Sequence, residues 1–238
     1  MSDKVRSFSA GPLSVIGFII LIGLLILLIP LFILGIIGAA FIKLGFSWIS
    51  ALAVVLLMVF GSFVNIPMYR LRRDIIHVSR NDAPDQMADP YHSPCPVWDT
   101  RISLNFGGAV IPAGVSIYLL YRAILVMGPS LLITVCAGII MVTAITFVST
   151  RRATSAGIRV PLLIPGLTAL LVSAMLSGGT GLTAAVTAFV SGTIGTLLGG
   201  NIANIFRISD LEISEVSIGG AGTFGAVFIC CILPALIA

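Results

Sequence analysis

The most constraining feature of this chain is the run of residues 12–42, which contains only apolar or small side chains and no charge. A helix needs about 20 mostly apolar residues to cross the roughly 30 Å hydrocarbon core of a membrane. The rest of the chain has the same character: 58% of its 238 residues are apolar and 9% are charged. A soluble domain carries about 25% charged residues, so we expect an integral membrane protein.

Seven stretches of the chain are long and apolar enough to be membrane spans. The first is overlong and includes Pro30, so it either forms one kinked helix or breaks into two pieces. It is also too long for a signal peptide, whose apolar region has about 7 to 15 residues. The sequence therefore predicts an all-α fold, a polytopic transmembrane helix bundle in which residues 1–238 form a single domain. The predicted spans are residues 13–40, 48–66, 104–126, 130–150, 160–176, 182–205 and 216–238.

The distribution of basic residues predicts the orientation, because Lys and Arg near span ends are retained in the cytoplasm. With seven spans, eleven basic residues fall on one side, and Lys43 and Arg122 fall on the other. Dividing the first stretch into a hairpin weakens this bias to four against nine. We therefore expect a multi-pass plasma-membrane protein with a cytoplasmic N-terminus and an external C-terminus. The polar segment 69–101 then forms a cytoplasmic loop between spans two and three.

The sequence offers little support for catalysis or metal binding. The four cysteines form no C-x-x-C pair and predict neither a disulfide framework nor a zinc site. Asp89, His92, Cys95 and Asp99 have no recognisable ligand spacing, and the prolines among them favour a solvated loop. We expect no catalytic residue, no metal, no cofactor and no nucleic-acid partner. The expected partners are the lipid bilayer and either a second copy of the chain or another subunit of a membrane complex.

Asparagine, threonine and glycine supply the polar character of the predicted spans. Their amide and hydroxyl groups are costly in lipid unless they are paired. Two Gly-Gly-Ala segments, which begin at Gly107 and Gly219, would allow close backbone approach or an unwound turn. Interrupted helices of this kind can mark a transporter site, but we favour close helix packing as the reason for these glycines and keep the binding site as the alternative. The candidate ligand-binding residues are Asn65, Asn105, Asn201, Asn204, Glu215, Ser217 and Thr223, and the candidate packing glycines are Gly107, Gly108, Gly195, Gly199, Gly219, Gly220 and Gly222.

Five stretches, residues 61–70, 105–112, 160–165, 195–199 and 217–224, together carry a family resemblance. They resemble the prokaryotic multi-pass membrane proteins grouped as the domain of unknown function 1614. The resemblance implies the membrane fold and the importance of the Gly-Gly-Ala segments, without implying an activity. It also places aspartates where this chain has Asn201 and Gly225, so acid chemistry or cation binding that depends on such a pair is not expected here.

We therefore expect a non-enzymatic small-solute or ion transporter, a channel-like protein or an accessory subunit. Two alternatives stay open, namely an intramembrane aspartyl-protease-like protein or its inactive relative, and a structural subunit of a membrane complex. Such a protease needs two membrane-embedded carboxylates that share a proton. Every aspartate of this chain lies in a predicted tail or loop.

Overall fold

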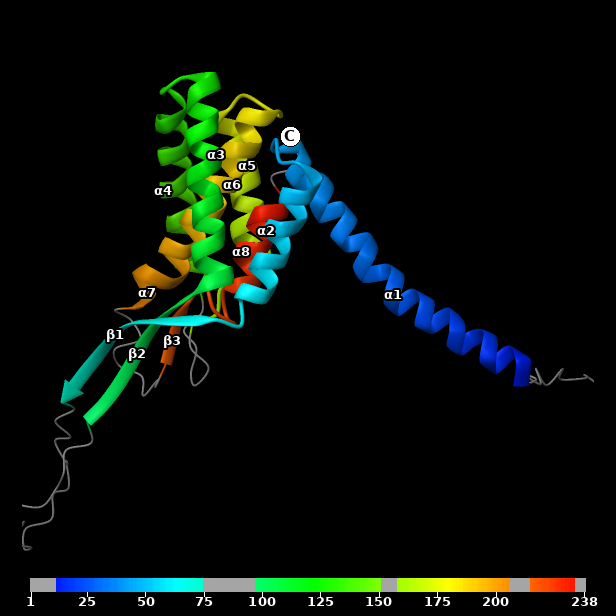
Figure 1. Ribbon diagram of the computed structural model, residues 1–238. Helices are drawn as coiled ribbons and strands as arrows, with labels where there is room; N and C mark the ends of the chain where they lie inside the picture. The colour runs from blue at the N-terminus through cyan, green and yellow to red at the C-terminus, as the bar shows by residue number, and fades with distance from the viewer. Residues whose placement is uncertain (1–11, 75–96, 151–157, 206–214, 234–238) are drawn as a thin grey trace, which may run out of the picture.

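The computed structural model describes residues 12–74, 97–150, 158–205 and 215–233, and the structural statements below concern these residues. Most of them are helical (Figure 1). The helices are α1 (Pro12–Lys43), α2 (Trp48–Gly61), α3 (Ile111–Met127), α4 (Leu131–Ser149), α5 (Ile164–Leu176), α6 (Leu182–Thr196), α7 (Ala203–Ile205) and α8 (Phe224–Ile232). Two π-helical segments, η1 (Phe106–Val110) and η2 (Leu197–Ile202), precede α3 and follow α6.

Three helical segments in the described part of the chain are long and apolar enough to cross a membrane. They are Phe106–Met127, Leu131–Ser149 and Leu182–Ile205. Each of the other predicted spans also contains a helix, but α2, α5 and α8 have only 14, 13 and 9 residues. The membrane character of the chain is thus supported, while seven spans and the positions of the termini stay predictions.

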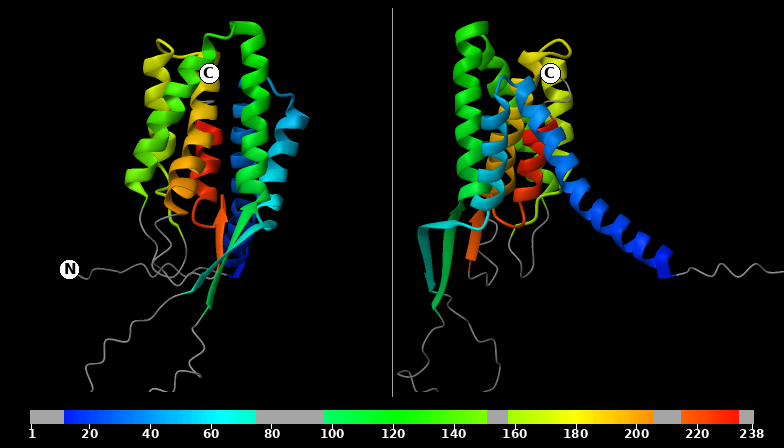
Figure 2. Two further views of the ribbon diagram at one scale, coloured as in Figure 1. Left: turned by 90° about the vertical axis from the view of Figure 1, so that its left-hand side faces the viewer. Right: turned by 45° about the vertical axis from the view of Figure 1, so that its right-hand side comes forward.

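The first predicted span is one helix of 32 residues rather than two pieces. It joins the bundle only near its C-terminal end, and its N-terminal part diverges from the other helices (Figures 1 and 2). Phe41 and Leu44 are buried there, whereas the described apolar side chains from Phe18 to Leu28 are exposed. A helix that is apolar on all sides and exposed is suited to lipid contact.

The prediction of an all-α fold is incomplete, because a three-stranded sheet lies at one end of the bundle (Figure 1). Its order is β1 (Asn65–Asp74), β2 (Val97–Asn105) and β3 (Glu215–Ile218), with β1 antiparallel and β3 parallel to β2. The predicted loop 69–101 therefore begins and ends in strands, and its middle lies outside the described residues. The predicted third and seventh spans begin in β2 and β3, which satisfy each other's backbone groups by parallel pairing.

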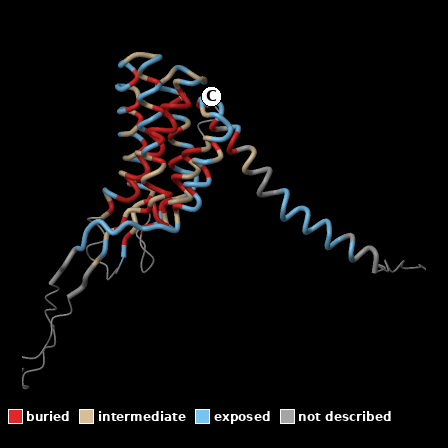
Figure 3. The backbone as a smooth tube through the Cα atoms, viewed as in Figure 1, coloured by how far each residue is buried: buried red, intermediate tan, exposed pale blue. Residues whose placement is uncertain are grey.

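Helix α6 occupies the centre of the bundle, in contact with α3, α4, α5 and α8. In its most apolar 18 residues, which extend into η2, 78% of residues are buried, against 28% for α4. Figure 3 shows the same contrast between buried inner helices and exposed outer surfaces. Small side chains such as Ala185, Ala188 and Gly192 allow the neighbouring helices to approach α6 closely.

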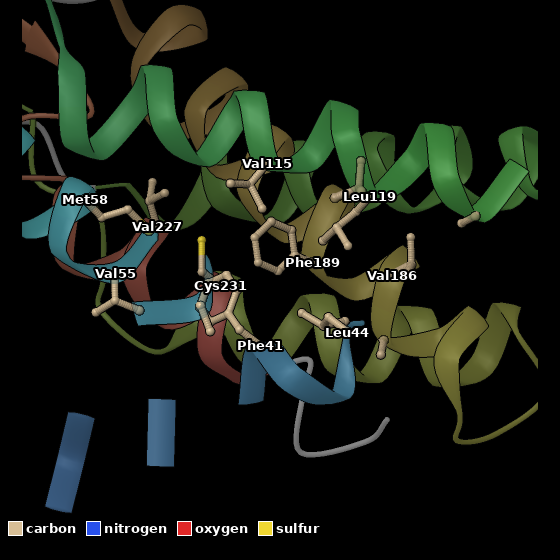
Figure 4. Close-up of a cluster of buried hydrophobic side chains, with 14 of the residues drawn as sticks. Phe41, Leu44, Val55, Met58, Val115, Leu119, Val186, Phe189, Val227 and Cys231 are labelled. Atoms are coloured by element: carbon tan, nitrogen blue, oxygen red, sulfur yellow. The ribbon is translucent and has the colours of Figure 1, made fainter. Parts of the chain in front are cut away.

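Apolar side chains from five helices meet α6 in the main core (Figure 4). The rings of Phe41 in α1 and Phe189 in α6 lie 6.0 Å apart in an edge-on arrangement, and both side chains are almost completely buried. Edge-on aromatic pairs of this kind add to the free energy gained from burial. This core fixes the end of α1 against the bundle and leaves the polar residues gathered at the sheet end.

Candidate functional site

A first polar cluster joins β1, β2 and β3 at the sheet end of the bundle. The amide nitrogen Nδ2 of Asn105 donates hydrogen bonds to the backbone oxygen of Ser62 at 2.6 Å and to Oδ1 of Asn65 at 2.9 Å. Oδ1 of Asn105 accepts from the backbone N–H of Gly108 at 2.7 Å and so caps η1. The hydroxyl of Ser217 donates to Oδ1 of Asn65 at 2.8 Å. Asn105 is buried, and both polar atoms of its side chain have hydrogen-bond partners.

A second polar cluster is centred on Asn201 in η2. Its side chain is completely buried, and its Oδ1 accepts a hydrogen bond from the hydroxyl of Thr223 at 2.7 Å. Its Nδ2 has no hydrogen-bond partner among the described residues. Nearby Asn204 instead donates to the backbone oxygens of Gly199 at 2.7 Å and Gly200 at 3.3 Å. Asn201 therefore carries a free buried donor, whereas Asn204 satisfies the backbone of the π-helical segment.

The two Gly-Gly-Ala segments lie against each other between these clusters. A Cβ atom placed on Gly108 would overlap the carbonyl oxygen of Gly219, and one placed on Gly219 would lie 2.6 Å from the carbonyl carbon of Gly108. Gly107 packs in the same way on the backbone of Met58 in α2, and Gly222 packs on the carbonyl oxygen of Ile158. The absence of side chains at these positions is what lets η1, α2 and the turn before α8 meet.

The remaining predicted packing glycines have distinct neighbours. A Cβ atom on Gly195 would lie 2.8 Å from Cβ of Val142, and one on Gly199 would overlap the carbonyl oxygen of Thr143. Both contacts join α6 and η2 to α4. Gly220 lies instead beside Ser217 within its own turn, where an added Cβ would be 2.5 Å from the serine Cβ.

The structure thus divides the predicted site residues rather than gathering them around one centre. Asn65, Asn105 and Ser217 form one hydrogen-bonded cluster, and Asn201 and Thr223 form the other. Glu215 is exposed, and its Oε1 accepts a hydrogen bond from the hydroxyl of Ser103 at 3.2 Å.

A cleft of about 420 Å³ opens beside the start of α8. Of the predicted residues it contains only Gly222, and none of the asparagines lines it. Its other lining residues are Arg159, Val160, Leu162, Ala221, Gly225 and Ala226.

Sequence reasoning missed a row of buried hydroxyl groups between α4 and α6. The hydroxyls of Thr143, Thr146, Thr187 and Ser191 have no hydrogen-bond partner in the described part of the chain. A Cβ atom on Gly138 would lie 3.3 Å from Oγ of Ser191, which places this hydroxyl at the α4–α6 contact. At the other end of the row, Thr146 lies beside Gly200, the residue before Asn201. The spacing of four between small residues in α6 was the available signal for this face.

The described residues show no arrangement of side chains typical of a metal centre. No group of three or more His, Cys, Asp or Glu side chains comes together within the described ranges. The thiols of Cys230 and Cys231 are free and buried, and they lie 3.4 Å and 3.7 Å from the hydroxyls of Thr196 and Thr193. The residues that the structure describes therefore offer neutral amide and hydroxyl groups for binding.

Comparison with known protein families gave a match that covers most of the chain. The family model described as Protein of unknown function (DUF1614) matches residues 59–237. This range includes the whole sheet, both π-helical segments and every helix from α3 to α8. Neither the curated proteins nor the solved structures gave a match.

Proposed function

The chain belongs to the family described as Protein of unknown function (DUF1614), a description that names no activity, so we propose a function from the geometry of the chain's polar groups. The protein is a non-enzymatic, multi-pass protein of the plasma membrane. It binds a small polar solute or ion inside the helix bundle and acts as a transporter, a channel-like protein or an accessory subunit.

The observation that carries this proposal is the amide nitrogen Nδ2 of Asn201, which has no hydrogen-bond partner among the described residues. Leaving a buried donor without a partner costs about 1 to 3 kcal/mol, and such groups are uncommon in native structures. The side chain is completely buried, and its Oδ1 is already occupied by Thr223. A ligand that enters the bundle and presents a hydrogen-bond acceptor, such as a carbonyl, a carboxylate or an inorganic anion, would satisfy this Nδ2.

The surroundings of Asn201 support a binding role. It lies in a π-helical segment, and such segments are frequent at functional sites because they interrupt the regular hydrogen bonding of the helix. The unpartnered hydroxyls of Thr146 and Thr143 lie along the adjoining α4 contact. Several neutral hydrogen-bond donors along one helix contact can replace the water molecules that a polar solute loses when it enters the bundle.

A proteolytic function has weaker support. An aspartyl protease needs two carboxylates that share a proton, and none of the described helices contains an Asp or Glu. Glu215, the acidic residue nearest to the clusters in sequence, is exposed in β3. Asn201 itself cannot act as a carboxyl general acid or base.

Thermal unfolding of the purified full-length protein tests this proposal against a panel of small carboxylates, amides and inorganic anions. A ligand at 100 times its dissociation constant stabilises the folded state by about 2.7 kcal/mol. We expect at least one of these solutes to raise the unfolding temperature of the wild type but not that of Asn201→Leu. Ser116→Ala is the matched control, because it removes a buried hydroxyl that is bonded to Pro112. An unchanged response of Asn201→Leu would rule out this site.

A further inference from the structure

Two arginines face each other across the hairpin formed by β1 and β2. Arg70 and Arg101 are direct partners in the antiparallel register, and both are exposed. Residues directly opposite in an antiparallel pair have Cβ atoms about 4.5 to 5.5 Å apart, and like charges at this separation destabilise the pairing. The arrangement calls for a negative charge to offset the repulsion.

The described neighbours of the two arginines offset only part of their positive charge. Within the described ranges, neither Arg70 nor Arg101 forms an ion pair or a side-chain hydrogen bond with a neighbour. Glu215 is the register partner of Arg101 on its other side, in the parallel pair of β2 and β3. Its carboxylate accepts a hydrogen bond from Ser103, and this row of three charged residues still has a net charge of +1.

The hairpin is also placed at a membrane boundary. Strand β2 continues directly into the helical segment Phe106–Met127, which is long enough to cross a membrane, so the hairpin leaves the bundle where that segment begins (Figures 1 and 2). Met68 and Tyr69, the two residues before Arg70, are 66% and 64% exposed. Aromatic residues are enriched at membrane interfaces, where their apolar rings and polar tips are both accommodated.

We propose that Arg70 and Arg101 together bind the phosphate of an anionic phospholipid headgroup. Guanidinium groups match phosphate oxygens in geometry and form charge-assisted hydrogen bonds with them. An anion bound by both arginines offsets their repulsion and so stabilises the pairing of β1 with β2 at the membrane surface. The exposed apolar residues beside the basic pair favour a lipid over free phosphate, because they contact the acyl region while the arginines reach the headgroup.

Lipid retention by the full-length protein tests this inference. The purified protein is equilibrated in mixed micelles that contain equal amounts of phosphatidylglycerol and phosphatidylcholine, and bound lipids are counted by native mass spectrometry. We expect Arg70→Gln and Arg101→Gln each to lower the preference for phosphatidylglycerol about fivefold, the contribution typical of one basic residue near an anionic surface. The double variant should lose more. Lys43→Gln, an exposed cation at the end of α1, should retain the wild-type preference.

Several results would overturn the proposal. One is a double variant that retains phosphatidylglycerol as well as the wild type, and another is an equal loss in Lys43→Gln. Displacement of the lipid by inorganic phosphate, beyond the effect of chloride at equal ionic strength, would identify free phosphate as the ligand instead.

Hydrogen exchange gives a second readout that does not depend on the glutamine variants. In lipid nanodiscs of the wild-type protein, phosphatidylglycerol should slow amide exchange in β1 and β2 relative to phosphatidylcholine. No difference in exchange between the two lipids would contradict the binding site. Failure of the lipid proposal would leave the proposed solute site untouched, because Asn201 lies in a different cluster.

Discussion

The backbones of Gly108 and Gly219 are in direct contact, so that a Cβ atom on either residue would overlap the carbonyl group of the other. This contact joins η1 to the turn between β3 and α8. The residues that follow on each side continue into α3 and α8, so one pair of glycines fixes how these helices begin. Asn105 caps η1, and Thr223, the hydrogen-bond partner of Asn201, belongs to the same turn as Gly219.

Replacing Gly219 with alanine should destabilise the protein strongly. Gly219 has φ +73°, a conformation that costs an L residue about 1 to 2 kcal/mol, and the added methyl group would also meet the backbone of Gly108. We expect a clear fall in the thermal unfolding temperature of the detergent-purified protein. Gly114→Ala in α3 is the matched control, because nothing lies within 4 Å of an added Cβ there. A Gly219→Ala protein that unfolds with the wild type would contradict this assignment.

Replacing Gly195 with leucine should separate α6 from α4. Even a Cβ atom at this position would lie 2.8 Å from Val142, and overpacking of a filled interior costs about 1 to 3 kcal/mol or more. We expect most of the protein to aggregate during purification and the remainder to unfold at a lower temperature. Gly23→Leu provides the control, since that position in α1 is exposed and has no neighbour within 4 Å. Normal yield and stability for Gly195→Leu would place this face of α6 against lipid.

The helices could be predicted from the sequence because their signal is local. Runs such as residues 131–149 are mostly apolar and uncharged, and within a membrane a helix pairs all of their backbone groups internally. The strands could not be predicted this way. The pairing of Arg70 with Arg101 and of Arg101 with Glu215 joins distant parts of the chain. Val216 and Ile218 of β3 are apolar, so this segment reads as the beginning of another span.

The candidate site shows the same division between local and non-local information. Composition and spacing selected Asn105 and Asn201 as costly groups that need partners, and both are buried. Which partners they have depends on packing. The side chain of Asn105 is hydrogen-bonded to Ser62 and Asn65, whereas that of Asn201 is hydrogen-bonded through its Oδ1 to Thr223. The sequence alone therefore treated two different amides as equivalent members of one pocket.

This difference predicts opposite outcomes for two identical substitutions. Asn105→Leu removes three hydrogen bonds and leaves the backbone N–H of Gly108 unpaired, and each unsatisfied buried group costs about 1 to 3 kcal/mol. Asn201→Leu removes one hydrogen bond, together with a donor that has no partner. We expect Asn105→Leu to lower the thermal unfolding temperature well below that of Asn201→Leu. Equal destabilisation of the two variants would argue that Nδ2 of Asn201 is paired in the native protein.

Neutralising Glu215 should strengthen the proposed lipid contact. Glu215 is the register partner of Arg101, so its negative charge opposes the binding of an anionic headgroup beside it. Glutamine keeps a side-chain oxygen that can accept the hydrogen bond from Ser103. We expect Glu215→Gln to raise the preference for phosphatidylglycerol in the native mass spectrum. The increase should shrink at high ionic strength, because exposed charges are screened, and a decreased preference would contradict the binding site.

The charge distribution predicts which end of the bundle faces the cytoplasm. Eleven of the thirteen basic residues fall on the side of the sheet in the seven-span topology, so the sheet end should be cytoplasmic. Ala221 is an exposed residue of the turn after β3, and Ser130 is exposed at the opposite end, between α3 and α4. In a variant with Cys95 replaced by serine, a membrane-impermeant maleimide added to intact cells should label Ser130→Cys and not Ala221→Cys.

The same labelling extends to two positions that lie outside the described residues, Ser93 in the predicted cytoplasmic loop and Ala238 at the predicted external end. Cysteine at position 93 should be protected in intact cells, and cysteine at position 238 should be labelled. Permeabilising the cells should expose positions 93 and 221, which controls for cysteines that are merely unreactive. Labelling of positions 130 and 221 from the same side would contradict an odd number of crossings by the segment that joins them. Labelling of position 221 alone would indicate the reverse orientation. The end of the bundle that carries only two basic residues, Lys43 and Arg122, would then face the cytoplasm, which contradicts the positive-inside rule.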